Sequence, residues 1–329
     1  MSSTTDRWSA SRGLISALVV ILALLGATEA EGQSWEHVRD QCAGSGPGLS
    51  VPCLELGLAA QGIRAGMGLL ATQGHPVPGS VSTVGRRLAT VPRAAVGLRV
   101  GGTSLRVPDL RGPVGEGGGM TPLTPSSQLS LALGVVDGFR LLPTVGGVLS
   151  VDLLGSAGVT HLSSSRGFGG PAVTYGAGLR VGLLRESFTL PGVSVTGMRY
   201  GGTTVRFGEI FPDGREVRVS PSTTSLRLSV GKDFLALGLT GGAGWDRYSG
   251  RVETRVRTAS GGEEGIWSGS VPSDDRLVVF GGGNLTFLVL QLAGEVGWAA
   301  GPGESPPAGA GVDPSRAGLF GSLAVRVTY

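Results

Sequence analysis

Apolar and polar residues alternate along most of the chain from residue 93 onward. The stretch at 129–135 reads LSLALGV, the stretch at 226–230 reads LRLSV, and the stretch at 290–298 reads LQLAGEVGW. Successive side chains of a strand point to opposite faces, so each stretch predicts a strand with one bulky apolar face and one small or polar face. The pattern predicts about ten such strands, near 93–106, 126–139, 146–162, 172–187, 191–207, 216–231, 235–250, 275–287, 289–300 and 318–329.

The composition of the two faces indicates which of them points inward. One face is built of Leu and Val, and the other is rich in Gly, Ala and Ser with occasional Arg and Asp. In a soluble barrel or sandwich the second face would meet water and should be rich in Lys, Glu, Thr and Gln. Small side chains suit the interior of a narrow barrel, which turns the Leu and Val side chains toward lipid. No helix separates the strands, so the sequence predicts an all-β fold, an antiparallel transmembrane β-barrel of about ten strands (eight to twelve) over residues 93–329.

The connections and the aromatic residues give two further indications of a barrel in a membrane. Connections at one end are short, as at 231–234 and 185–192, and those at the other end are long, at 107–125, 250–274 and 302–317. Aromatic side chains favour the two boundaries of a bilayer. The predicted strand ends at the side of the short connections carry Phe139, Phe188, Phe234, Phe287 and Tyr329. The predicted outer boundary carries Tyr175, Trp245 and Trp298.

The last strand ends in LAVRVTY, which places an aromatic residue, Tyr329, at its end. An alternating strand that ends in this way resembles the C-terminal assembly signal of bacterial outer-membrane β-barrel proteins. The resemblance covers 93–329 and points to no subfamily. It implies location in the bacterial outer membrane, with outer-membrane lipid and the outer-membrane assembly machinery as partners. Arg199 departs from the pattern, because it lies on the apolar side of its strand. Either a bulge at Gly201 and Gly202 changes the parity, or Arg199 reaches the headgroups, or the strand is miscounted.

The first third of the chain has a different character. Residues 1–30 have a positive start, an apolar run and small residues at the end, which predicts a cleaved signal peptide, with a membrane anchor as the alternative. Residues 31–92 are predicted to be a periplasmic segment held by a Cys42–Cys53 disulfide. Apolar residues recur at helical spacing within 54–74, which predicts a short helix packed outside the barrel. The alternative for this helix is a plug inside the lumen.

Charge and composition narrow the choice of partners and chemistry. Charged residues make up 16% of the chain and the net charge is +3, which argues against a nucleic-acid partner. The sequence contains no cluster of metal-ligand spacing, so neither a metal site nor another cofactor is predicted. His161 and Ser163 resemble the His-x-Ser pair of outer-membrane lipid A deacylases, but no carboxylate partner is identifiable, and no catalytic residue is assigned.

Charged residues on the inward face of the predicted strands are the main candidates for function. They are either ion pairs that stabilise a closed interior or the lining of a narrow, arginine-containing pathway for a small solute. The candidate lumen-lining residues are Arg99, Asp152, Arg180, Arg206, Arg227, Asp246, Glu295 and Arg326. We expect a structural, surface-exposed barrel or a porin-like small-solute channel, and not an enzyme. The alternatives are an adhesion or ligand-binding barrel that acts through its long loops, and a lipid hydrolase that uses His161 and Ser163.

Overall fold

The computed structural model describes residues 34–44, 48–87, 91–115, 118–139, 148–209, 214–257, 264–301, 306–307 and 310–329. The predicted signal peptide at 1–30 lies outside the described residues. Neither helix of the described part is long and apolar enough to cross a bilayer.

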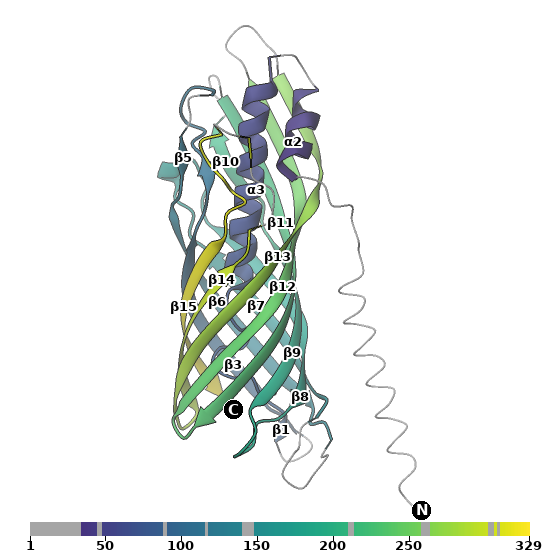
Figure 1. The fold of residues 1–329 in the computed structure, drawn as a ribbon, viewed down its shortest axis with the longest axis vertical. Helices are drawn as coiled ribbons and strands as arrows, with labels where there is room; N and C mark the ends of the chain where they lie inside the picture. Colours follow the sequence, from purple (N-terminus) through teal and green to yellow (C-terminus); the bar gives the residue numbers. More distant parts are fainter. Residues whose placement is uncertain are drawn as a thin grey trace, which may run out of the picture.

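One antiparallel sheet closes on itself and forms a barrel of ten strands (Figure 1). The two short segments β9 and β10 pair with different parts of the same neighbour, β11, and count as one strand. The barrel closes where β15 pairs with β3, from Phe320↔Thr103 to Thr328↔Ala95. The segments of the barrel are β3 (Ala94–Ser104), β6 (Leu123–Val136), β7 (Ser150–Thr160), β8 (Ala172–Leu184), β9 (Gly192–Gly202), β10 (Val205–Glu209), β11 (Gly214–Phe234), β12 (Leu237–Arg257), β13 (Glu264–Phe287), β14 (Leu290–Ala299) and β15 (Gly318–Thr328). The predicted fold class is confirmed.

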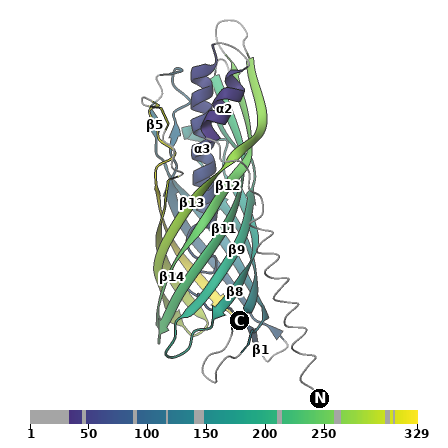
Figure 2. The ribbon, with the colours of Figure 1, turned by 45° about the vertical axis from the view of Figure 1, so that its right-hand side comes forward.

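The remaining elements lie inside the barrel or at its ends. Two helices, α2 (Ser34–Ala43) and α3 (Ser50–Thr72), precede the barrel strands. Short elements complete the fold, and they are β1 (Arg86–Arg87), β2 (Val91–Pro92), β4 (Val107–Pro108), β5 (Gly119–Met120) and a 3-10 helix (Ser164–Arg166). The helices lie at the end of the barrel opposite to the C-terminus (Figures 1 and 2). We call these two ends the helical end and the C-terminal end.

The Leu and Val side chains of the barrel point outward, as the alternation predicts. Leu98 and Leu323 are 54% and 67% exposed, whereas Asp152 and Arg180 on the opposite face are fully buried. An outer wall of exposed hydrocarbon around a charged interior is stable only where the wall meets lipid.

Above this apolar wall, at the helical end, the polarity of the two faces of the sheet is reversed, so that the outer face is polar and the inner face apolar. On β11 the outward residues change from Leu228 and Leu226 to Thr224, and the inward residues change from Arg227 to the buried Val219. The inward valines of β11, β12 and β13 pack with apolar residues of α2 and α3 in one core. This part of the molecule therefore has the apolar-in arrangement of a water-soluble protein, and the reversal marks where the bilayer ends.

The strands β12 and β13 run further than the sequence indicates. Residues 250–274 were expected to form a loop, but β12 continues to Arg257 and β13 begins at Glu264 (Figure 2). Val252, Val256 and Val271 of this extension are buried in the core shared with α3. The loop prediction is wrong because the helices supply an apolar surface on which the extended strands can bury one face.

A bulge separates β9 from β10 and reverses which side chains face inward. Gly201 of β9 pairs with Ser222 of β11, and Val205 of β10 pairs with Val219 of β11. From the first pair to the second, the chain of β9 and β10 advances by four residues (201 to 205), whereas β11 advances by only three (222 to 219). The extra residue shifts the alternation by one. Arg206 was predicted to line the lumen, but it lies on the outer face, where its side chain is 56% exposed. Arg199 precedes the bulge and is also outward.

Replacing an outward apolar side chain in the middle of the wall should weaken the folded state in lipid. We expect Leu323→Arg to lower the free energy of unfolding by about 2–4 kcal/mol, because a charge at mid-depth meets hydrocarbon. The matched control is Thr224→Arg, beyond the edge of the wall, where the expected loss is at most about 1 kcal/mol. Urea titration of the protein in vesicles, read on a gel that separates folded from boiled protein, measures both. Equal effects of the two substitutions would contradict the outward assignment.

Candidate functional site: a lumen filled by the chain itself

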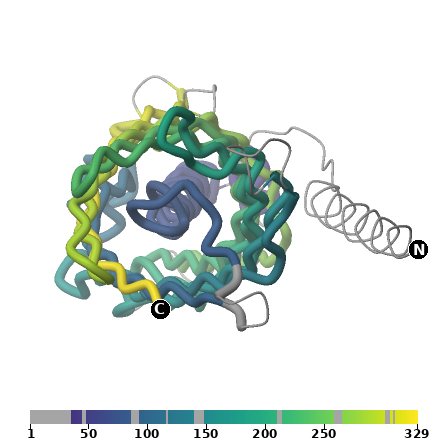
Figure 3. The backbone as a smooth tube through the Cα atoms, turned by 90° about the horizontal axis from the view of Figure 1, so that it is seen from below, coloured from purple at the N-terminus to yellow at the C-terminus, as the bar shows by residue number. Residues whose placement is uncertain are grey.

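The interior of the barrel is occupied by a segment of the same chain. Helix α3 enters at the helical end, and the chain continues from it inside the ring of strands toward the C-terminal end (Figure 3). From Pro52 to Thr72, all residues of α3 but Leu54 are buried. The chain that follows is also buried at Gln73, His75 and Thr83. We call residues 50–85 the plug.

Glycines let the plug lie close to the wall. A Cβ atom on Gly68 of α3 would lie 2.4 Å from the Cδ1 atom of Tyr248 on β12, which is closer than atoms can approach. At Gly74 the backbone turns with φ +66, and a Cβ atom there would lie 2.1 Å from the Oε2 atom of Glu295. A side chain at either position would push the plug away from the wall.

Three ion pairs on the wall hold the plug by its backbone as well as by its side chains. The first joins Arg227 of β11 to Asp246 of β12, with Nη1–Oδ1 and Nη2–Oδ2 distances of 2.5 and 2.8 Å. The hydroxyl of Thr72, at the end of α3, donates to Asp246 Oδ2 at 2.8 Å, and Arg227 donates to the Thr72 carbonyl at 3.3 Å. Tyr248 also donates to Asp246. This pair therefore fixes the end of the helix.

The second ion pair joins Arg99 of β3 to Glu295 of β14, with an Nη2–Oε2 distance of 2.9 Å. Arg99 also donates to the carbonyl oxygens of Gln73 and His75, and the amide of His75 donates to Glu295 Oε2 at 3.2 Å. Both charges of the pair are thus bonded to the backbone of the turn that follows α3.

The third ion pair joins Asp152 of β7 to Arg180 of β8, with an Nη2–Oδ2 distance of 2.6 Å. The amide of Val84 donates to Asp152 Oδ2 at 3.0 Å, and Arg180 donates to the carbonyl of Ser80 at 2.8 Å. The last part of the plug is held in this way, next to the start of the barrel.

Two further ion pairs hold α3 at the helical end. Arg64 pairs with Asp274 of β13 and donates to the carbonyl of Pro272 at 2.7 Å. Glu55 pairs with Arg215 of β11 at 2.9 Å. Burial raises the pKa of Glu55, and the nearby charge of Arg215 opposes that shift. The whole length of the plug is therefore bonded to the wall.

Comparisons with solved structures find other barrels. The chain is similar to the outer-membrane protease OmpT from Escherichia coli, with 12% identity, coverage of 72% of this chain and 96% of that chain, and a TM-score of 0.41. It is also similar to the translocator domain of the autotransporter NalP from Neisseria meningitidis, with 11% identity, coverage of 72% and 88%, and a TM-score of 0.37. For the attachment invasion locus protein Ail of Yersinia pestis the identity is 9%, the coverage 72% and 99%, and the TM-score 0.27. The sequence matches no protein-family model and no curated protein.

The fold is that of a bacterial outer-membrane β-barrel. The short connections of such a barrel face the periplasm, and here two residues join β11 to β12 and two join β13 to β14. The C-terminal end is therefore periplasmic, and the helical end is extracellular. Tyr329 lies at the periplasmic end and is exposed, and its role as an assembly signal stays a prediction.

The position of the N-terminal segment in this outer-membrane barrel differs from the predicted one. The segment 31–92 was expected to lie in the periplasm with its helix outside the barrel, but α3 lies in the lumen and α2 at the extracellular end. Polar groups of the wall, which would otherwise be buried without partners, bond to the plug and favour this position. The predicted disulfide is present and joins Cys42 of α2 to Cys53 of α3, with a Cα–Cα distance of 5.6 Å.

Most of the charged residues predicted to line the lumen do point inward. Six of them form the three ion pairs with the plug, and they are Arg99, Asp152, Arg180, Arg227, Asp246 and Glu295. Arg326 is also inward, and its Nε atom has no hydrogen-bond partner among the described residues. Sequence reasoning missed Glu55, Arg64 and Thr72 on the plug. The only signal for Glu55 and Arg64 is that they are charged residues in an otherwise apolar helix.

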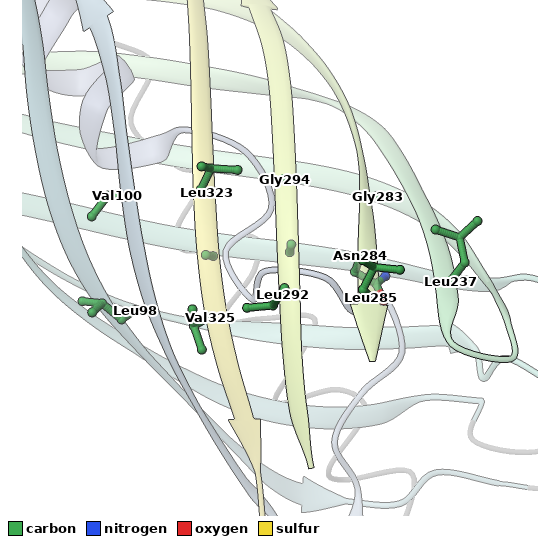
Figure 4. Close-up of a pocket in the computed structure, with 12 residues that line it drawn as sticks. Leu98, Val100, Leu237, Gly283, Asn284, Leu285, Leu292, Gly294, Leu323 and Val325 are labelled. Carbon is green, nitrogen blue, oxygen red and sulfur yellow. The ribbon is translucent and has the colours of Figure 1, made fainter. Parts of the chain in front are cut away.

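The predicted catalytic alternative and a depression on the outer wall lie away from the lumen. His161 and Ser163 are both exposed at the extracellular end, and the Ser163 hydroxyl lies 2.8 Å from that of Ser165. On the outer wall, strands β12 to β15 and β3 surround a depression of about 510 Å³, lined by apolar side chains with Gly283 and Gly294 in its floor (Figure 4). Because these glycines face outward, this depression opens toward lipid. Among the described residues, no group of three His, Cys, Asp or Glu side chains is placed to hold a metal.

Removing one partner of a wall ion pair should loosen the plug locally. Asp152→Asn leaves Arg180 buried without a counter-charge, which costs about 3–5 kcal/mol. We expect amide hydrogen exchange at residues 80–84 to become at least about a hundred times faster. The matched control is Asp275→Asn, which removes the partner of Arg247 from a half-buried pair on the outer wall, away from the plug, and should change exchange at 80–84 little. Unchanged exchange at 80–84 in Asp152→Asn would contradict the anchoring role.

Proposed function

We propose that the protein is a sealed outer-membrane barrel that displays its N-terminal helices at the cell surface. The observation that supports this most directly is the plug, because residues 50–85 fill the lumen and bond to its wall at three levels. In this proposal the plug closes the barrel to solutes, and the exposed parts at the extracellular end supply the surface on which a partner would act.

The inward arginines support closure rather than conduction. An arginine that selects a small anion must leave donors free for the passing ion. Arg99, Arg180 and Arg227 each donate hydrogen bonds to a carboxylate of the wall and to a carbonyl oxygen of the plug. A channel would require the plug to leave, and its departure would remove these bonds from buried charges at three places. The narrow channel is therefore the weaker of the two functions predicted from the sequence.

The extracellular part has the features of a displayed domain. The helices α2 and α3 are joined by the disulfide and share a core with the extended strands. His37 of α2 lies edge-on to Trp267 of β13, with 5.8 Å between the ring centroids. A disulfide and a core of this kind hold a rigid shape above the bilayer. Adhesion or ligand binding would use this surface, with the described residues 107–115, 118–125 and 310–317 beside it.

A conductance experiment tests closure. In planar bilayers the intact protein should give no steady current steps. The double variant Arg99→Ala with Arg227→Ala removes the arginine bonds to the carbonyl oxygens of Thr72, Gln73 and His75 and leaves two buried carboxylates without counter-charges. We expect this variant to give steps. The control is Arg206→Ala with Arg257→Ala, which removes two outward arginines and should stay silent. Steady steps from the intact protein whose ion selectivity changes in Arg180→Ala would support the channel and contradict the sealed barrel.

Chemical labelling of intact cells tests the display. Lys232 is the only lysine of the chain and lies at the periplasmic end. Gln41 is exposed on α2, so the Gln41→Lys variant should react with a membrane-impermeant amine reagent at residue 41, while Lys232 reacts only after the outer membrane is opened. Peptide mass spectrometry locates the label. Labelling of Lys232 without labelling at residue 41 would place α2 in the periplasm.

A further inference from the structure

A patch of arginine and hydroxyl side chains lies on the outer wall directly beyond the apolar surface. It faces sideways from β9, β11 and β12 rather than upward from a loop. Its members are outward because the residues between them, such as Tyr200, Thr223 and Tyr248, are buried inside the barrel. We call it the boundary patch, and it consists of Arg199, Ser220, Ser222, Thr224, Arg247, Ser249 and Arg251.

The strand register brings these side chains together. Arg199 pairs with Thr224, which pairs with Arg247 on its other side, so the two arginines lie two strands apart, about 10 Å between backbones. Ser222 pairs with Ser249, and Ser220 with Arg251. These neighbours form a continuous polar surface. Within it the Ser249 hydroxyl donates to the Ser222 carbonyl at 3.4 Å, and the Ser220 hydroxyl lies 2.8 Å from that of Thr204.

The patch begins where the lipid-facing wall stops. The row before it contains Leu226 and Trp245, which pair with each other. The guanidinium carbon of Arg247 lies 4.8 Å from the centre of the Trp245 ring, which ties the first charge of the patch to the aromatic boundary. Headgroups occupy the zone within about 5–8 Å of the hydrocarbon edge, and two residues of a strand advance by about 7 Å. The first arginines of the patch are therefore at headgroup depth.

The charges of the patch are only partly balanced. Arg247 pairs with Asp275 at 2.9 Å. Within the described part of the chain, neither Arg199 nor Arg251 has an ion pair or a hydrogen-bond partner for its side chain. The patch is also confined to one side of the barrel, because the outward residues at the extracellular ends of β6, β8 and β15 are Leu123, Val173 and Leu319. Glu253 also faces outward on β12, two residues beyond Arg251, so the surface keeps an excess of positive charge rather than a purely positive one. An excess on one side only is more than a general consequence of reaching the headgroups.

We propose that the boundary patch binds the phosphate groups of anionic lipids in the outer leaflet. The planar guanidinium group donates two parallel hydrogen bonds to a phosphate, and serine and threonine hydroxyls add further donors. The sideways orientation selects a ligand that lies in the membrane plane, which is a lipid headgroup rather than a solute. The binding involves the outer wall alone and does not depend on whether the lumen is sealed.

Lipid titration of the full-length protein tests the proposal. The purified protein in detergent is titrated with phosphatidic acid, with phosphatidylcholine and with inorganic phosphate, and native mass spectrometry counts what is bound. We expect phosphatidic acid to bind more tightly than either of the other two. Arg199→Gln combined with Arg251→Gln should weaken it by about tenfold or more. The matched control is Arg257→Gln, an outward arginine six residues further along β12, which should bind as the unaltered protein does.

Three results would overturn the proposal. Equal binding of phosphatidylcholine would mean that apolar contact alone retains the lipid. Equal binding of inorganic phosphate would assign the patch to a free anion. An equal loss of affinity for phosphatidic acid in Arg257→Gln would mean that any outward positive charge contributes and that the patch has no special role. Gel mobility before and after boiling shows that each variant is folded, and the comparison of the three ligands on the unaltered protein stands without any variant.

Discussion

Hydrocarbon offers no partner to a charge or to a backbone amide, and this constraint governs the rest of the structure. It requires a closed ring of strands, because an open edge would leave backbone groups unpaired in lipid. It also sends buried charges of the wall to the inner face, as with Asp152 and Arg180. The charged groups that line this interior must then find hydrogen-bond partners inside the barrel. The plug is the element that supplies the missing partners.

The ion pairs of the wall and the backbone of the plug stabilise each other. A buried pair alone gains little, since desolvation offsets most of its Coulomb attraction, unless further hydrogen bonds complete it. Here the carboxylate of Asp246 accepts from Thr72, and that of Glu295 accepts from His75. In return, the charged side chains of the wall bond to backbone amides and carbonyls in the turn and coil of the plug. These backbone groups have no partner in a helix or a sheet. The inward charges thus bind the plug in this structure, so inward arginines alone do not indicate a pore.

The reversal of polarity along β11 and β12 connects the wall, the displayed part and the lipid boundary. Below it, Leu226 and Trp245 face lipid and Arg227 faces the lumen. Above it, valines face α3, whereas Arg247 and Arg251 face outward. One pair of strands therefore contacts lipid in its lower part and water in its upper part. Where the surroundings change, the apolar side chains move from the outer face to the inner face. The outward arginines that follow Trp245 lie at this change, where phosphate groups of the headgroups are also found.

The sequence by itself determined the elements whose signal is local. The period-two alternation is set within each strand, so the ten strands and their outward Leu and Val faces could be predicted. The disulfide could be predicted because the chain has only two cysteines and a segment that resembles a secretory signal. Only the tertiary structure decided what fills the lumen, since the bonds from Thr72 and Val84 reach residues 174 and 68 positions away. It also decided the orientation of Arg206, because one extra residue at a bulge reverses a face without changing the alternation on either side. The alternation within a strand depends on which surroundings each face meets, so it can be seen in the local sequence. The bonds between the plug and the wall depend on which distant segments the closed ring brings together.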